Sequence, residues 1–136
     1  MALAKRIDHV GIAVKDVDAA VASFVRNFGF PIERQGEVAA LGIRRAHLRI
    51  GDATLELFAP QSEQHPVAKF LGARGEGMYL LSLEVEDLAA AASRLAAKGI
   101  ALRTERLDDG TQLGFINPRQ AHGVLLQLIE LPKSRG

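Results

Sequence analysis

Residues 7–17, IDHVGIAVKDV, decide the fold, because the same pattern returns at residues 78–88 as MYLLSLEVEDL. In both stretches apolar residues alternate with others, as in a half-buried strand, and an aspartate then precedes an alanine-rich run with helical spacing. The two stretches lie 71 positions apart. A repeat at a fixed offset indicates two copies of one structural unit, so each half is expected to begin with a strand followed by a helix.

The far ends of the two halves repeat at the same offset. Residues 55–60 read LELFAP and residues 126–131 read LQLIEL, so that Glu56 matches Gln127. In the first half an alternating run turns at Gly51-Asp52 into a second run, which is typical of a hairpin. The predicted strands of this region are residues 43–50 and 54–58 in the first half, and 100–104, 112–116 and 124–129 in the second. Each half therefore has the pattern βαβββ.

Two helices are predicted at matching places, over residues 17–27 and 88–98, ending at Gly29 and Gly99. The units span about residues 5–60 and 76–131, and a linker at 61–75 contains a short helical turn after Pro66. We expect one α+β domain over residues 1–136: a single curled, eight-stranded mixed sheet around a shared cavity, with the helices outside.

Composition excludes several classes of function. The 136 residues carry 17 Lys and Arg against 16 Asp and Glu, which is too little positive charge for nucleic-acid binding through phosphates alone. The absence of Cys removes disulfides, thiolate metal sites and cysteine nucleophiles. No apolar run is long enough to span a membrane, and no signal-peptide pattern opens the chain. A cytoplasmic protein is the expectation.

Five stretches together resemble methylmalonyl-CoA epimerases of the vicinal oxygen chelate superfamily, which also holds glyoxalase I and the bleomycin-resistance proteins. They are IDHVGIAV at 7–14, PVAKFL at 66–71, GEG at 75–77, FINP at 115–118 and GVLL at 123–126. The resemblance implies the glyoxalase-like fold and a small-molecule ligand. Because that family commonly pairs its sheets and the chain is 48% hydrophobic, we expect a homodimer.

The resemblance also implies a metal site, since the four positions that bind a divalent metal in the family fall on His9, Glu56, Leu80 and Gln127. Leu80 has no electron pair to donate, and Gln127 stands where epimerases have Glu. His9, Glu56 and Gln127 remain as donors of the kind that Co, Ni, Mn or Zn accept. The alternative is that His9 and Glu56 form a buried hydrogen-bonded pair facing Gln127 without any metal. Both possibilities stay open.

The strand at 43–50 is predicted to have one apolar and one cationic face. Alternation puts Ala46, Leu48 and Ile50 on one side and Arg45, His47 and Arg49 on the other. The cationic side is a candidate site for an anionic group of a substrate, or else the solvated face of an edge strand. In some epimerases a catalytic Glu occupies the place of Arg45, and epimerisation requires two bases.

Three other side chains are weaker candidates. Phe115 is expected to stack on a ligand or to pack in the core. His122 lies in a turn and is expected on the surface or, as the resemblance implies, at the rim of the ligand site. Leu80, at a ligand position, would line that site as an apolar wall. His65 is expected on the surface.

Three functions are consistent with these residues. The first is an isomerase or lyase of the glyoxalase and epimerase type, in which a metal polarises a carbonyl and Glu56 moves the adjacent proton. Its substrate would be a small anionic carbonyl compound such as a CoA or glutathione thioester. The second is the same chemistry without metal through His9 and Glu56, and the third is a metal-free binding or sequestration protein of the bleomycin-resistance type.

Overall fold

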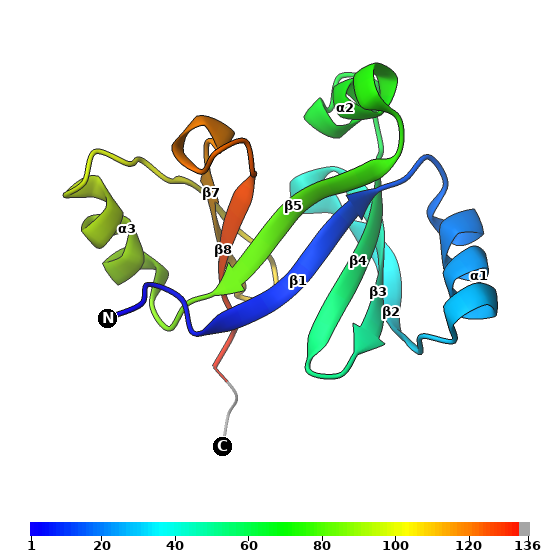
Figure 1. Cartoon of the computed structure of the whole chain (residues 1–136), viewed down its shortest axis with the longest axis horizontal. Coiled ribbons are helices and arrows are strands. Elements are labelled where there is room, and N and C mark those ends of the chain that lie inside the picture. The colour runs from blue at the N-terminus through cyan, green and yellow to red at the C-terminus, as the bar shows by residue number, and fades with distance from the viewer. Residues whose placement is uncertain (134–136) are drawn as a thin grey trace. The chain divides into compact units, whose positions relative to one another are not determined.

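The protein follows the predicted βαβββ order in both halves (Figure 1). The computed structural model describes residues 1–133. The first half contains β1 (Arg6–Ala13), α1 (Val17–Phe28), β2 (Ile32–Val38), a 3-10 turn (Ala39–Leu41), β3 (Ile43–Ile50) and β4 (Ala53–Pro60). After α2 (Pro66–Arg74), the second half contains β5 (Gly77–Glu84), α3 (Leu88–Ala96), β6 (Arg103–Arg106), β7 (Gln112–Ile116), a 3-10 turn (Pro118–Gln120) and β8 (Leu126–Glu130).

The strands form an eight-stranded mixed sheet in the order β2-β3-β4-β1-β5-β8-β7-β6, which confirms the predicted fold class. β1 pairs in parallel with β4, with Gly11 opposite Glu56, and β5 pairs in parallel with β8, with Ser82 opposite Gln127. Strand β3 pairs antiparallel with β2 and β4, and β7 pairs antiparallel with β6 and β8. Since both parallel registers keep the offset of 71 positions, the sequence repeat is also a repeat of strand register.

The chain forms two compact units, His9–Tyr79 and Met1–Asp8 together with the chain from Leu80 onward. The boundaries therefore fall inside β1 and β5. Charge explains why the first residues join the second half, because Lys5 lies 2.8 Å from Glu86 and Arg6 lies 3.0 Å from Glu84. Leu3 and Ala4 also pack on the apolar cluster of that unit.

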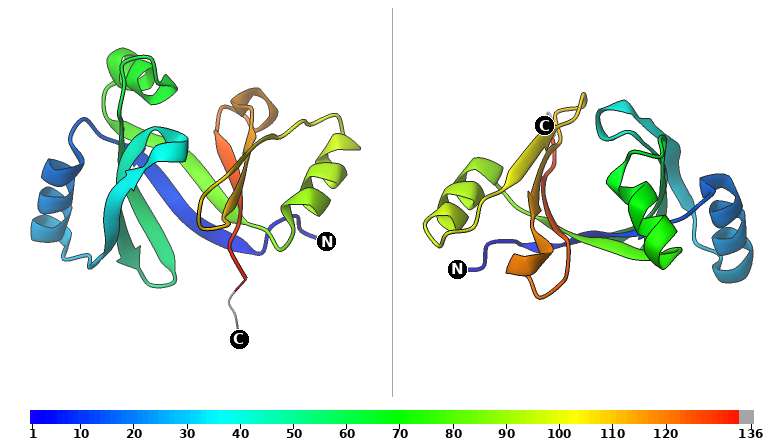
Figure 2. Two further views of the ribbon diagram at one scale, coloured as in Figure 1. Left: turned by 180° about the vertical axis from the view of Figure 1, so that it is seen from behind. Right: turned by 90° about the horizontal axis from the view of Figure 1, so that it is seen from above.

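Helix α1 covers one face of the strands in the His9–Tyr79 unit (Figure 2). Its buried Val17 and Val21 pack with Ala46, Leu48 and Leu57 of β3 and β4. Asp16 begins the helix by accepting a hydrogen bond from the Ala19 N–H at 3.1 Å. Gly29 ends the helix in the left-handed conformation, with φ of 71°, as the sequence predicts.

Helix α3 has the same role in the other unit, where Leu88 and Ala91 pack with Ile116 and Leu128. Asp87 caps it by accepting from the Ala90 N–H at 3.0 Å. The next strand begins at Arg103 rather than at residue 100 as predicted, since Ile100 and Leu102 pack against this cluster instead.

Strand β2 could not be located from the sequence, because IERQGEV is almost entirely exposed and has no apolar alternation. It pairs with β3 along its whole length. The alternative of β3 as a solvated edge strand is therefore wrong, because β3 lies between β2 and β4. Within the described residues, no helix is long and apolar enough to cross a membrane.

Candidate functional site

Glu56 of β4 is a buried carboxylate with basic side chains around it. Its Oε2 atom lies 2.8 Å from Nε2 of His47 and 3.5 Å from Nη1 of Arg45. Its Oε1 atom lies 3.9 Å from Nε2 of His9. His9 and His47 are buried as well, so this cluster is a charged site removed from water.

Strand register brings these four side chains together. The two-residue turn at Gly51-Asp52 places His47 directly opposite Glu56. β1 runs parallel to β4 with Gly11 opposite Glu56, and His9 precedes Gly11 by two residues, on the same face of the strand. All four belong to the His9–Tyr79 unit.

The surroundings of Glu56 keep it ionised at neutral pH. Burial acts to raise the pKa of this carboxyl, but the His47 hydrogen bond and the electrostatic interactions with His9, His47 and Arg45 outweigh it, and the pKa is lowered. A buried carboxylate that stays ionised is the form that a general base needs.

The predicted cationic face of β3 divides into two parts. Arg45 and His47 face Glu56, whereas Arg49 is exposed and interacts with Glu33 at 3.3 Å and with Thr54 at 3.4 Å. Ala46 and Leu48 pack on the opposite side with α1. Ile50, expected on the apolar side, is exposed beside the hairpin turn.

The matching positions of the other unit carry no charge. Leu80 is buried, and buried Gln127 accepts a hydrogen bond on Oε1 from the Ser82 hydroxyl at 2.7 Å. Phe115 lies opposite Gln127, with the Arg103 guanidinium 4.5 Å above its ring. His122 is exposed in the turn before β8, with φ of 56°.

The donor set does not fit the four-ligand metal site that the resemblance implies. Leu80 offers no donor, and the Gln127 oxygen is already engaged by Ser82. Glu56 has a guanidinium 3.5 Å away, which would repel a divalent cation. Across residues 1–133, no group of three or more His, Asp or Glu side chains is arranged to hold a metal ion.

Some residues were misjudged or missed at the level of sequence. His65, expected on the surface, is half-buried and caps α2: its Nδ1 accepts from the Val67 N–H at 3.1 Å, and its Nε2 donates to the Leu41 carbonyl at 2.8 Å. His47 as the partner of Glu56 could have been found from the hairpin register. Ser82 could have been found from the repeat. It corresponds to Gly11 of the first half, and it lies opposite Gln127 as Gly11 lies opposite Glu56.

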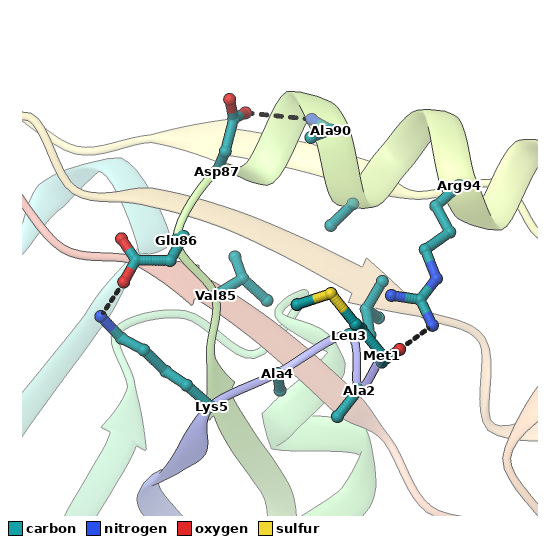
Figure 3. Close-up of a pocket in the computed structure, with 11 residues that line it drawn as sticks. Met1, Ala2, Leu3, Ala4, Lys5, Val85, Glu86, Asp87, Ala90 and Arg94 are labelled. Atoms are coloured by element: carbon teal, nitrogen blue, oxygen red, sulfur yellow. Dashed lines mark hydrogen bonds and ion pairs between the residues drawn. The ribbon is translucent and has the colours of Figure 1, made fainter.

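A separate cavity of about 430 Å³ lies in the unit that contains α3 (Figure 3). Its apolar lining includes Leu3, Val85 and Ala91. The charged groups at its rim already have partners: Lys5 pairs with Glu86, and Arg94 donates to the Met1 carbonyl. It therefore lacks the poised titratable groups that mark the Glu56 cluster as the candidate site.

Comparison with known proteins identifies relatives over nearly the whole chain. The model of the Glyoxalase/Bleomycin resistance protein/Dioxygenase superfamily matches residues 6–128. The ethylmalonyl-CoA/methylmalonyl-CoA epimerase of Cereibacter sphaeroides is 28% identical over 128 residues, covering 90% of this chain and 96% of the relative.

Solved structures of methylmalonyl-CoA epimerases are also similar to this chain. The crystal structure of methylmalonyl-CoA epimerase from Mycobacterium tuberculosis is 35% identical, with a TM-score of 0.91, covering 98% of this chain and 92% of that one. A methylmalonyl-CoA epimerase variant from Streptomyces coelicolor, in complex with 2-nitronate-propionyl-CoA, is 31% identical, with a TM-score of 0.88 and coverage of 96% and 99%.

Proposed function

The chain belongs to the glyoxalase, bleomycin-resistance and dioxygenase superfamily, and we propose that it is an epimerase-type enzyme acting on a small anionic acyl thioester such as an acyl-CoA. The reaction is proton transfer at the carbon next to the thioester carbonyl. The observation that supports this proposal most directly is the buried, ionised Glu56 held between His47, His9 and Arg45.

Glu56 is the base in this proposal. Its carboxylate takes the α-proton, the C–H bond breaks, and the electron pair moves to the carbonyl oxygen to give an enolate. The Arg45 guanidinium offsets the negative charge that develops on that oxygen, as a fixed cation does in a site removed from water. Return of the proton from Glu56 to the carbon completes the cycle.

The stereochemical outcome depends on how many bases the site holds. Inversion at the α-carbon needs one base on each face, and the place where some relatives carry a second carboxylate is occupied by Arg45, which cannot accept a proton. A single base removes and returns the proton on the same face. We therefore propose that exchange of the α-proton with solvent exceeds epimerisation, and that methylmalonyl-CoA is epimerised slowly or not at all.

Two findings support an acyl-CoA as the substrate class. A relative of known structure binds a CoA ester, and a curated relative acts on ethylmalonyl-CoA and methylmalonyl-CoA. The proposed proton transfer uses the chain's own residues and assigns no role to Co, Ni, Mn or Zn. Leu80 carries no donor atom, the Gln127 oxygen is engaged by Ser82, and the Arg45 guanidinium lies beside Glu56. The alternative of a binding protein without catalysis is an outcome of the test below.

The test is deuterium exchange. Methylmalonyl-CoA is incubated with the purified protein in D2O, and deuterium at the α-carbon is followed by mass spectrometry against a protein-free sample. We expect exchange above that background, and a loss of about 100-fold or more in Glu56→Gln. Glu33→Gln, which removes an exposed carboxylate of the same unit, should exchange like the wild type. Binding without exchange would identify a binding protein and overturn the proposal, as would full activity in Glu56→Gln.

A further inference from the structure

One row of side chains crosses three strands at the candidate site. Arg34 of β2 lies opposite His47 of β3, and His47 lies opposite Glu56 of β4. The contacts follow the row: Nε of Arg34 lies 3.4 Å from Nδ1 of His47, and Nε2 of His47 lies 2.8 Å from Oε2 of Glu56. The two ring nitrogens of His47 thus face two different partners.

The other unit carries the matching row with one difference. Arg103 of β6 lies opposite Phe115 of β7, and Phe115 lies opposite Gln127 of β8. The Arg103 guanidinium stacks 4.5 Å above the Phe115 ring, because a phenyl ring offers its face and no nitrogen. Both units thus place an arginine beside an aromatic ring. The two rows differ in that the His47 ring has two nitrogens that form hydrogen bonds to both neighbours, whereas the Phe115 ring has none.

The partner of each ring nitrogen determines where the proton of His47 lies. A guanidinium only donates hydrogen bonds, so Nδ1 of His47 must be the accepting, unprotonated nitrogen. Nε2 then carries the proton and donates it to the Glu56 carboxylate. His65 shows the same logic at an unrelated place, since its Nδ1 accepts from the Val67 N–H and its Nε2 donates to the Leu41 carbonyl.

We propose that Arg34 is a positioning residue that holds His47 as the Nε2–H tautomer and thereby fixes which oxygen of Glu56 reacts. Oε2 is occupied by the His47 N–H and faces Arg45. Oε1, on the side of His9, is left as the atom that takes the α-proton. This inference rests on the proposed function, because it assigns the reacting atom of the base in that reaction.

The first test needs no activity. With ¹⁵N-labelled histidine, the nitrogen chemical shifts of the four imidazoles are recorded at about pH 8.5, well above the ordinary His pKa of about 6.5, and His47 is assigned with His47→Gln. We expect a dominant Nε2–H form of His47 in the wild type and a mixture of both tautomers in Arg34→Met. His65 is the internal reference, and its tautomer should stay unchanged. A His47 tautomer that is the same in both proteins overturns the proposal.

The second test measures deuterium exchange. Arg34→Met should lower kcat by about tenfold, the usual effect of one lost hydrogen bond, with little change in KM, and Arg34→Lys should recover part of the rate. Arg44→Met is the matched control, because Arg44 of the neighbouring strand pairs with Asp18 instead. An unchanged rate in Arg34→Met overturns this inference and leaves the proposed function standing. Absence of exchange in the wild type overturns both.

Discussion

His47 and Glu56 lie directly opposite each other on β3 and β4, with Nε2 of His47 2.8 Å from Oε2 of Glu56. The pairing holds a buried carboxylate in its ionised form, so it affects stability as well as chemistry. The free energy of unfolding should therefore depend on pH in part through Glu56.

We expect Glu56→Gln to lower the free energy of unfolding by about 3 kcal/mol at pH 7, the usual cost of breaking a buried ion pair. The pKa of Glu56 is lowered in the folded protein, so its contribution is complete above the unfolded value of 4.5. It is lost as the pH falls from there through the lower folded value.

Urea unfolding between pH 7 and pH 3 checks this expectation. The difference between wild type and Glu56→Gln should shrink below about pH 4.5, whereas Glu33→Gln should differ little from the wild type throughout. A difference of constant size across the range would show that Glu56 stabilises the fold by packing and not by charge.

Arg45 should control the stereochemical result of the reaction. In Arg45→Glu a second carboxylate stands beside Glu56, and we expect the ratio of epimerisation to deuterium exchange to rise. Arg45→Gln removes the cation without adding a base, so it should lower exchange and leave the ratio unchanged. Chiral analysis of the product, together with mass spectrometry, gives both rates. Equal ratios in the two variants would contradict a second-base role for this position.

The buried hydrogen bond between Ser82 and Gln127 should behave as a coupled pair. Ser82→Ala and Gln127→Leu each leave one buried polar partner behind, at a cost of about 2 kcal/mol in the free energy of unfolding. The double variant removes both groups and should cost less than the two single changes together. Chemical denaturation of all four proteins measures the coupling, and strictly additive costs would mean that the bond contributes nothing.

The two helix caps should contribute equally to the free energy of unfolding. Asp16→Ala and Asp87→Ala each remove the hydrogen bond to the N–H group three residues on, and each should cost about 1 kcal/mol. Thermal melts compare them with Asp108→Ala, an exposed turn residue expected to stay within about 0.5 kcal/mol of the wild type. A cap change no larger than this control would count against the predicted helix starts.

The fold was accessible from the sequence because its main signals are local. The alternation at 7–17 and 78–88, the aspartate caps and the Gly29 stop all act within a few residues, and the common offset of 71 links the halves. The second helix ends at Ala96, before the predicted stop at Gly99. The position of strand β2 was not predicted, because an exposed strand has no alternating apolar residues in its sequence. Its place in the sheet depends on pairing with β3.

The candidate site was only partly accessible, because its contacts cross strands. His9 and Glu56 stood out through the repeat, but the role of His47 depends on the register of a hairpin. Arg34 could not be found from local pattern, since its strand was itself unlocated. The role of the Ser82 hydroxyl could not be predicted locally, because its hydrogen-bond partner Gln127 lies on another strand.

The division of β1 and β5 between the two units has a consequence for cutting the chain. β1 gives Arg6–Asp8 to one unit and His9–Ala13 to the other, and β5 is divided between Tyr79 and Leu80. A chain severed between Pro60 and Pro66 would yield two pieces, each carrying a strand segment that the unit in the other piece requires. Neither piece would be a complete module, which suits the protein to reconstitution from separately expressed halves and makes either half unfit for grafting alone.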